Sequence, residues 1–135
     1  MTYTELKNRQ QSELNAFPCF FAFSNKQFDD GMRRLGLSPD DTSAIYHGFG
    51  GMYYRCNDSK KLSEMFSRFD AELSAALNDY DFAVDAFQTE IANHECHYTG
   101  SVGEALAALA LDADTVNSSP VLRRALAAAW TAGEA

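Results

Sequence analysis

The residues best suited to chemistry lie together in the segment Asn93-His94-Glu95-Cys96-His97. Two imidazoles, a thiol and a carboxylate are groups that bind zinc or transfer protons. The two histidines are three residues apart, whereas the zinc-protease motif places them four apart with a glutamate directly after the first. His47 and Cys56 would be further zinc ligands. The segment supports one hypothesis, a small metal-binding domain or enzyme that uses His94 and His97.

Helix geometry argues against a metal ion at this segment. At 100° per residue, a helix that continues through these positions places His94 and Cys96 about 160° apart, so the two cannot bind one ion. The competing interpretation is a His94 ring on the core side with a hydrogen-bonded nitrogen. A nucleophilic pair of Cys56 and His47 has no neighbour in the sequence that would activate the thiol. We therefore predict a protein that is not an enzyme and has no metal and no cofactor.

Charge is distributed unevenly along the chain, whose net charge is −8. Residues 1–68 hold nine Lys/Arg and eight Asp/Glu, whereas residues 69–122 hold ten Asp/Glu and no Lys/Arg. Such a stretch repels nucleic acid and anionic lipid, so we expect direct binding to neither. A basic protein would be attracted to it.

We predict that carboxylates of this acidic stretch form a partner-binding surface. On a helix over 80–98, Asp81, Asp85 and Glu95 fall within about 80° of one another, opposite the apolar stripe. The plainer interpretation is a solvated face that keeps a small protein soluble. The sharper one is an exposed surface, not neutralised by cations, that imitates a row of phosphates and binds a basic, nucleic-acid-binding protein. The predicted partner-binding residues are Asp70, Glu72, Asp79, Asp81, Asp85 and Glu95.

Hydrophobic spacing and capping residues predict a chain that is mainly helical. We predict helices over 4–16, 25–35, 59–77, 80–98 and 101–109 and from Pro120 onward, and strands over 19–23, 44–49 and 52–56. The pair Gly50-Gly51 permits the positive φ of a hairpin turn. The fold class is therefore α+β, with a small antiparallel sheet of about three strands, including a hairpin at 44–56, covered by four to six helices. A ligand pocket between the aromatic strands and the helix over 80–98 is a third functional hypothesis.

Length and cysteine usage bear on domain number and compartment. The chain of 135 residues is typical of a single domain, which we predict to span 1–135. Cys19, Cys56 and Cys96 are odd in number and far apart, which does not suit a disulfide framework. The sequence contains neither a signal-peptide pattern nor a run of about 20 apolar residues. We therefore expect a cytoplasmic protein.

Several short stretches resemble a family of uncharacterised small proteins carried by phages and mobile elements of Gram-positive and gut bacteria. The matching pieces are Phe20–Phe28, the Gly50-Gly51-Met52-Tyr53 turn, Ala92-Asn93-His94-Glu95 with Tyr98-Thr99, and Glu104-Ala105-Leu106. The resemblance implies a mobile-element origin and names no activity. It also implies an aromatic residue at position 96, so the cysteine there argues against a ligand role. Small acidic proteins of mobile elements block host nucleases, and this analogy favours the phosphate-imitating interpretation.

Overall fold

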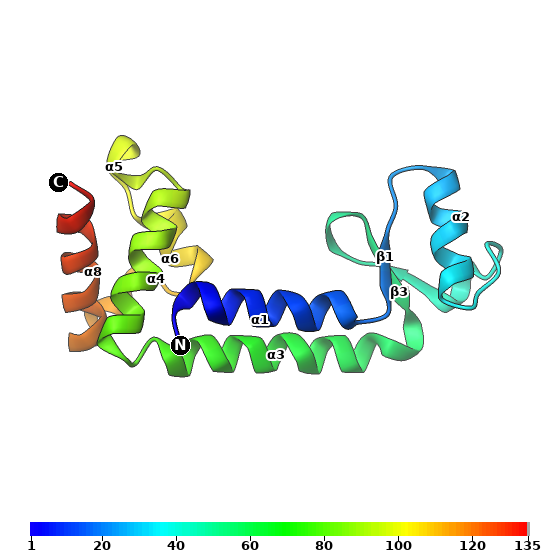
Figure 1. Ribbon diagram of the computed structural model, residues 1–135, viewed down its shortest axis with the longest axis horizontal. Helices are drawn as coiled ribbons and strands as arrows, with labels where there is room; N and C mark the ends of the chain where they lie inside the picture. The colour runs from blue at the N-terminus through cyan, green and yellow to red at the C-terminus, as the bar shows by residue number, and fades with distance from the viewer. Residues whose placement is uncertain (135) are drawn as a thin grey trace. The chain divides into compact units, whose positions relative to one another are not determined.

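The computed structural model describes residues 1–134, and its contacts divide the chain into two compact units (Figure 1). We call them the helical unit, which comprises Met1–Gln10 and the residues from Arg68 onward, and the sheet unit, which comprises Gln11–Ser67. Two helices, α1 (Tyr3–Ala16) and α3 (Ser59–Ala76), contribute residues to both units. The single domain expected from the sequence stays a prediction.

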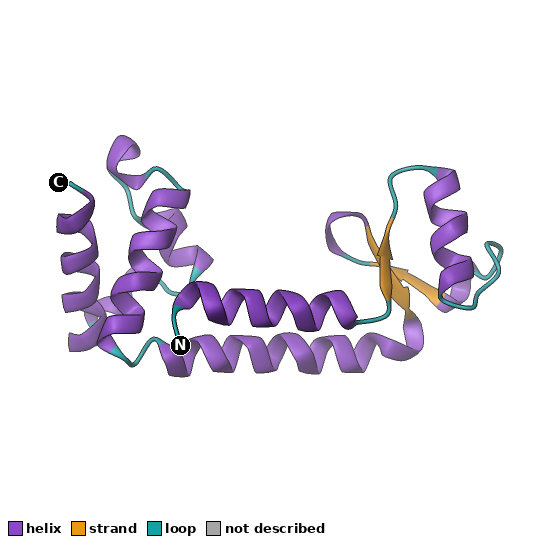
Figure 2. Cartoon of the chain, viewed as in Figure 1, coloured by secondary structure: helices purple, strands orange, loops and turns teal. Residues whose placement is uncertain are grey.

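The sheet unit contains three short antiparallel strands in the order β1-β3-β2 (Figure 2). Their bounds are β1 (Cys19–Phe21), β2 (Ile45–His47) and β3 (Met52–Arg55). Tyr53 of β3 pairs with Phe20 on one side and His47 on the other. Its ring stacks on both, with centroid distances of 5.2 Å to Phe20 and 4.5 Å to His47. The sheet thus has one face built from stacked rings.

The helix α2 (Asn25–Arg34) packs against this ring-bearing face. The Ser24 hydroxyl accepts a hydrogen bond from the backbone N–H of Gln27, as its predicted capping role requires. Phe28 contacts Phe20 and Tyr53 edge to face, and Met32 is fully buried. Between β2 and β3, Gly50 and Gly51 have φ of 65° and 80°, which confirms the predicted glycine turn.

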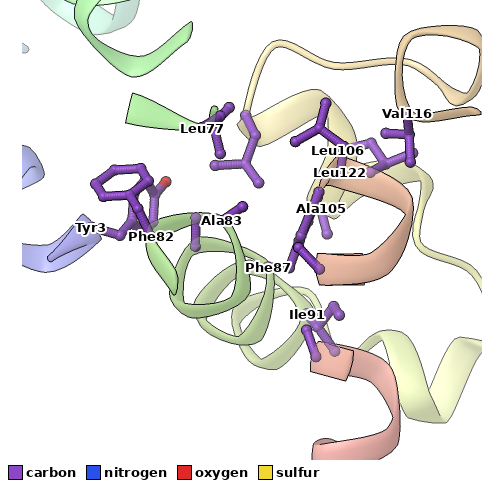
Figure 3. Packing of buried hydrophobic residues seen from close by; sticks show 14 of the residues in the cluster. Tyr3, Leu77, Phe82, Ala83, Phe87, Ile91, Ala105, Leu106, Val116 and Leu122 are labelled. Carbon is purple, nitrogen blue, oxygen red and sulfur yellow. The ribbon is translucent and has the colours of Figure 1, made fainter. Parts of the chain in front are cut away.

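The helical unit is built around α4 (Tyr80–Asn93). It also contains α5 (Cys96–Thr99), α6 (Gly103–Ala108), α7 (Ala113–Asn117) and α8 (Pro120–Gly133). The buried residues of α4 are Phe82, Ala83, Ala86, Phe87, Glu90 and Ile91. Ala125 and Ala129 of α8 are also buried, and these small side chains let α4 and α8 approach closely. Figure 3 shows Tyr3 beside Phe82 at one end of the resulting core.

The α+β fold class is confirmed, with more helices than the four to six predicted. Within residues 1–134 there are eight, because α7 was not predicted and the helix predicted over 80–98 is divided in two. It ends at Asn93, and Glu95 then adopts the left-handed conformation, with φ of 51°, before α5 begins. The sequence prediction also missed α7, which Asp112 caps by accepting a bond from the N–H of Thr115. In the described part of the chain no helix has the length and apolar character needed to span a bilayer.

Candidate functional site

Four of the six predicted partner-binding carboxylates belong to exposed residues. Asp70 lies on α3, Asp79 and Asp81 lie at the start of α4, and Glu95 follows its end. Asp79 has a second role, because its carboxylate caps α4 by accepting a hydrogen bond of 2.9 Å from the N–H of Phe82. These four residues all lie in the helical unit, within the stretch that has no lysine or arginine.

Glu72 does not fit the prediction of carboxylates without cations. Arg9 of α1 donates a hydrogen bond to it, and Arg68 lies 3.5 Å away on the preceding turn of α3. Desolvation raises the pKa of Glu72, but hydrogen bonds from Arg9 and Gln10 and the charges of both arginines outweigh it and hold the pKa below its usual range. The expectation of an uncompensated charge is therefore wrong at Glu72.

Asp85 anchors the start of α1. Its carboxylate accepts a hydrogen bond of 3.0 Å from the backbone N–H of Tyr3, and the residue is half-buried. The first N–H groups of a helix have no partner within the helix and attract negative charge, so an aspartate there stabilises α1. Asp85 therefore contributes to the attachment of α1 to α4 and only weakly to the exposed surface.

Beside this contact lies a buried polar cluster around Glu90 that the sequence reasoning missed. Glu90 is 3% exposed. Its carboxylate accepts hydrogen bonds from the Tyr3 hydroxyl at 2.9 Å and from Lys7 Nζ and Asn93 Nδ2 at 3.4 Å each. His94 Nε2 lies 3.3 Å from its other oxygen. A buried carboxylate is tolerated when donors surround it, and here α1 and α4 both supply them.

Two neighbours of Glu90, Tyr3 and His94, are also part of the cluster. Burial raises the pKa of the Tyr3 phenol well above its usual range, and its hydrogen bond to Glu90 and the charge of Glu90 act in the same direction. The phenol therefore keeps its proton and remains a donor. His94 is partly exposed, and its Nδ1 lies 3.5 Å from Glu104 of α6, so its ring stands between carboxylates of two helices. The cluster ties α1, α4 and α6 together.

The segment 93–97 places its candidate ligands at three different locations. His94 contacts Glu90 and Glu104, the Cys96 side chain is buried in the core, and His97 packs on Trp130 of α8 with a centroid distance of 3.9 Å. Within residues 1–134 no group of three or more His, Cys, Asp or Glu side chains is placed to hold a metal ion. His94 and His97 thus serve separate contacts.

The other two candidate residues lie in the sheet unit. His47 stacks on Tyr53, and the Cys56 thiol donates to the carbonyl oxygen of Ser43 at 3.5 Å. Cys56 and His47, considered from the sequence as a nucleophilic pair, therefore each contact a different group.

Two shallow hollows meet around His97, and we call them together the His97 groove. Both are lined by Ile91, Ala92 and His97. The first, of about 450 Å³, reaches Glu95 and Tyr98. The second, of about 270 Å³, is completed by Gln88, Ala129, Ala132 and Gly133. The His97 ring lies close to the backbone of α8, since a Cβ added at Gly133 would be 2.3 Å from Nε2.

A sequence signal for the Glu90 cluster did exist. Glu90 occurs three residues after Phe87 and four before His94, on the same side of α4 as the apolar stripe. A carboxylate at a core-facing position indicates a buried polar contact. Its donors Tyr3 and Lys7 lie over eighty residues away, so the sequence did not identify them.

The chain matches the model of a protein family. A model of a family of unknown function matches residues 2–132, and so covers both units. No curated protein and no solved structure matches the chain.

Proposed function

The chain belongs to this family, DUF7659, and because the family's function is unknown we propose one from the residues themselves: a non-enzymatic module that binds a basic protein. The observation that carries the proposal is a group of exposed carboxylates, Asp70, Asp79, Asp81 and Glu95, in a stretch with no lysine or arginine. Exposed charges of one sign steer a partner of opposite charge and raise its association rate. We propose that these four residues act together, and we call them the acidic surface.

Two residues of the predicted set are left out of the acidic surface. Glu72 is paired with Arg9 and Arg68, and Asp85 accepts the N–H of Tyr3. A carboxylate that is paired with arginines, or that is half-buried as Asp85 is, adds little attraction for a partner, whereas Asp79 caps α4 and is still exposed. The proposal therefore depends on the four that remain.

We propose further that the partner is a nucleic-acid-binding protein in the cytoplasm, and that the gene belongs to a phage or mobile element. A surface of carboxylates resembles a row of phosphates and fits the basic groove of such a protein. The support for the origin is the resemblance of the short stretches between Phe20 and Leu106 described above. Neighbouring genes that encode defence or anti-defence proteins would support the proposal, and neighbouring housekeeping genes would count against it.

Salt-dependent binding tests the acidic surface. The tagged full chain is used to capture proteins at low salt, and the captured partner is then purified and titrated with the chain at rising salt. Because exposed charges are screened beyond about 10 Å at 0.1 M salt, the affinity should fall steeply. A partner whose binding ignores salt would contradict the proposal, as would the absence of any partner.

A pair of matched variants locates the binding. The first neutralises three members of the acidic surface and keeps the cap of α4, since asparagine also caps: Asp70→Asn, Asp79→Asn and Asp81→Asn. The control removes the same charge from the sheet unit: Asp30→Asn, Asp40→Asn and Glu64→Gln. We expect the first variant to bind at least about tenfold more weakly and the control to bind nearly as tightly as the parent chain.

The alternative is a metal-binding domain or small enzyme that uses His94 and His97. The observation in its favour is His94 itself, a partly exposed imidazole between Glu90 and Glu104. Elemental analysis of protein purified without an affinity tag tests it. Stoichiometric zinc, iron or manganese would favour this alternative over the interaction module.

A further inference from the structure

We propose that the His97 groove receives a basic amphipathic helix of the partner, an inference that rests on the proposed function and names the segment that is bound. The groove has an apolar floor, because Ile91, Ala92, Ala129 and Ala132 line it. Small side chains on α4 and α8 let a third helix approach both backbones closely. An apolar groove between two helices is a common site for an amphipathic helix.

The negative charge of the groove favours an occupant with positive charge. Glu95 lines it, and no lysine or arginine is found among its lining residues in the described chain. The last turns of α4 and α8, represented by Ala92 and Gly133, meet there. Carbonyl groups at the C-terminal ends of helices carry partial negative charge. A lysine or arginine next to apolar residues would place its stem on the floor and its charge beside Glu95.

Tyr98 supplies a contact at the rim. Its side chain is 91% exposed and also lines the larger hollow. Tyrosine is enriched among the residues that dominate binding energy, because it buries a large ring and keeps a polar tip. The left-handed conformation of Glu95 makes the turn that separates α4 from α5, which carries this tyrosine. The apolar floor, the charge of Glu95 and the Tyr98 contact at the rim thus come from consecutive parts of one segment and from α8.

Titration with synthetic peptides tests the proposal on the full chain. The probe is an amphipathic helix of leucine and lysine, and two controls replace lysine by glutamate or scramble the order so that the apolar face is lost. Backbone amide signals are followed by NMR. We expect the lysine peptide to shift signals of residues 91–98 and 129–133, and both controls to bind at least about tenfold more weakly.

Matched variants separate the groove from general attraction. Ala132→Trp fills the groove, and Ala75→Trp adds the same ring to an exposed site on α3. Glu95→Lys and Asp70→Lys change the net charge equally and both alter the acidic surface, and only the first alters the groove. We expect Ala132→Trp and Glu95→Lys to weaken peptide binding about tenfold relative to their controls. Circular dichroism verifies that all four variants keep their helix content.

Three outcomes would overturn this proposal. The first is peptide binding that is sensitive to salt and that each variant weakens as much as its control does. This result would assign the peptide to the acidic surface as a whole, and the proposed function would still stand. Absence of peptide binding would also reject the groove, while the capture experiment would still decide the proposed function. If the NMR signals of residues 91–98 shift when only the protein concentration is raised, the groove would be assigned to a second copy of this chain.

Discussion

Glu90 is a charged residue that the fold buries and surrounds with donors. Removing a carboxylate from water is unfavourable by several kcal/mol unless hydrogen bonds replace the lost hydration. Here the Tyr3 hydroxyl, Lys7, Asn93 and His94 surround it. The donors come from two helices, so the cluster also fixes α1 against α4.

Substitution of Glu90 should therefore destabilise the helical unit. We expect Glu90→Ala to lower the free energy of unfolding by about 2–3 kcal/mol, because it leaves the buried Tyr3 hydroxyl without its acceptor. Urea denaturation followed by circular dichroism measures this change. The control is Asp70→Asn, an exposed carboxylate on α3 outside the cluster, for which we expect a change within about 0.5 kcal/mol. Equal effects would show that Glu90 is not the centre of the cluster.

Tyr3 should make stability depend on alkaline pH. Its pKa is raised in the folded state, so below the usual tyrosine pKa of about 10 both states are protonated and the stability is fully present. Above that pH the unfolded chain loses the proton first, and the free energy of unfolding falls. We expect Tyr3→Phe to reduce this alkaline decline and Tyr98→Phe, at an exposed site, to retain it. Urea midpoints between pH 8 and pH 11 would measure both.

At the scale of elements, the connections between helices decide where the side chains of segment 93–97 point. Within residues 1–134, two residues other than glycine adopt the left-handed conformation, Glu95 with φ of 51° and Ala110 with φ of 56°. Residues with a Cβ are disfavoured there by about 1 kcal/mol or more. The first ends α4 and redirects the chain, and the second follows α6. Contacts elsewhere in the helical unit must hold both turns.

Ala110→Gly should therefore stabilise the chain. Glycine adopts positive φ without a steric penalty, and we expect a gain of about 0.5–1 kcal/mol in the free energy of unfolding. Ala107→Gly, three residues earlier inside α6, is the matched control and should be destabilising by a similar amount. Thermal melting of both variants beside the parent chain measures the difference. A loss of stability in both would contradict the argument.

Elements with local signals were predicted well from the sequence. Ser119-Pro120 predicted the start of α8, and the Gly50-Gly51 pair predicted the turn between β2 and β3; the structure confirms both. The end of α4 was predicted wrongly, because the apolar spacing continues to Tyr98 while distant contacts end the helix. Burial of Cys96 and the position of His94 beside Glu104 are such contacts.

The candidate site was predicted only in part for the same reason. Residue types alone identified the acidic stretch. They did not show that Arg9 pairs with Glu72, because no local pattern connects residues 63 positions apart. The Glu90 cluster likewise depends on α1, which the sequence alone did not place beside α4.

At the scale of the whole molecule, the described residues form two clusters of buried apolar side chains. One surrounds α4 in the helical unit, and the other consists of Phe20, Ala22 and Met32 with their neighbours in the sheet unit. Each cluster lies within one unit as the contacts divide the chain. Units with separate cores can open separately, and hydrogen exchange reports such local opening.

We expect each core to protect its own unit. Met32→Ala and Phe87→Ala both truncate fully buried side chains and should each lower local stability by about 2–5 kcal/mol. In hydrogen exchange followed by mass spectrometry, the first should accelerate exchange within residues 11–67 and the second within residues 1–10 and 68–134. Acceleration throughout the chain by either variant would instead support the single domain predicted from the sequence.

The contact between His97 and Trp130 gives the chain a built-in optical reporter. Trp130 is the chain's only tryptophan, and its ring lies against the imidazole that lines both hollows of the groove. Indole emission depends on its immediate surroundings, so a molecule that displaces His97 or excludes water beside it would change the intensity or the wavelength. Occupancy of the groove can then be followed by fluorescence without attaching a dye.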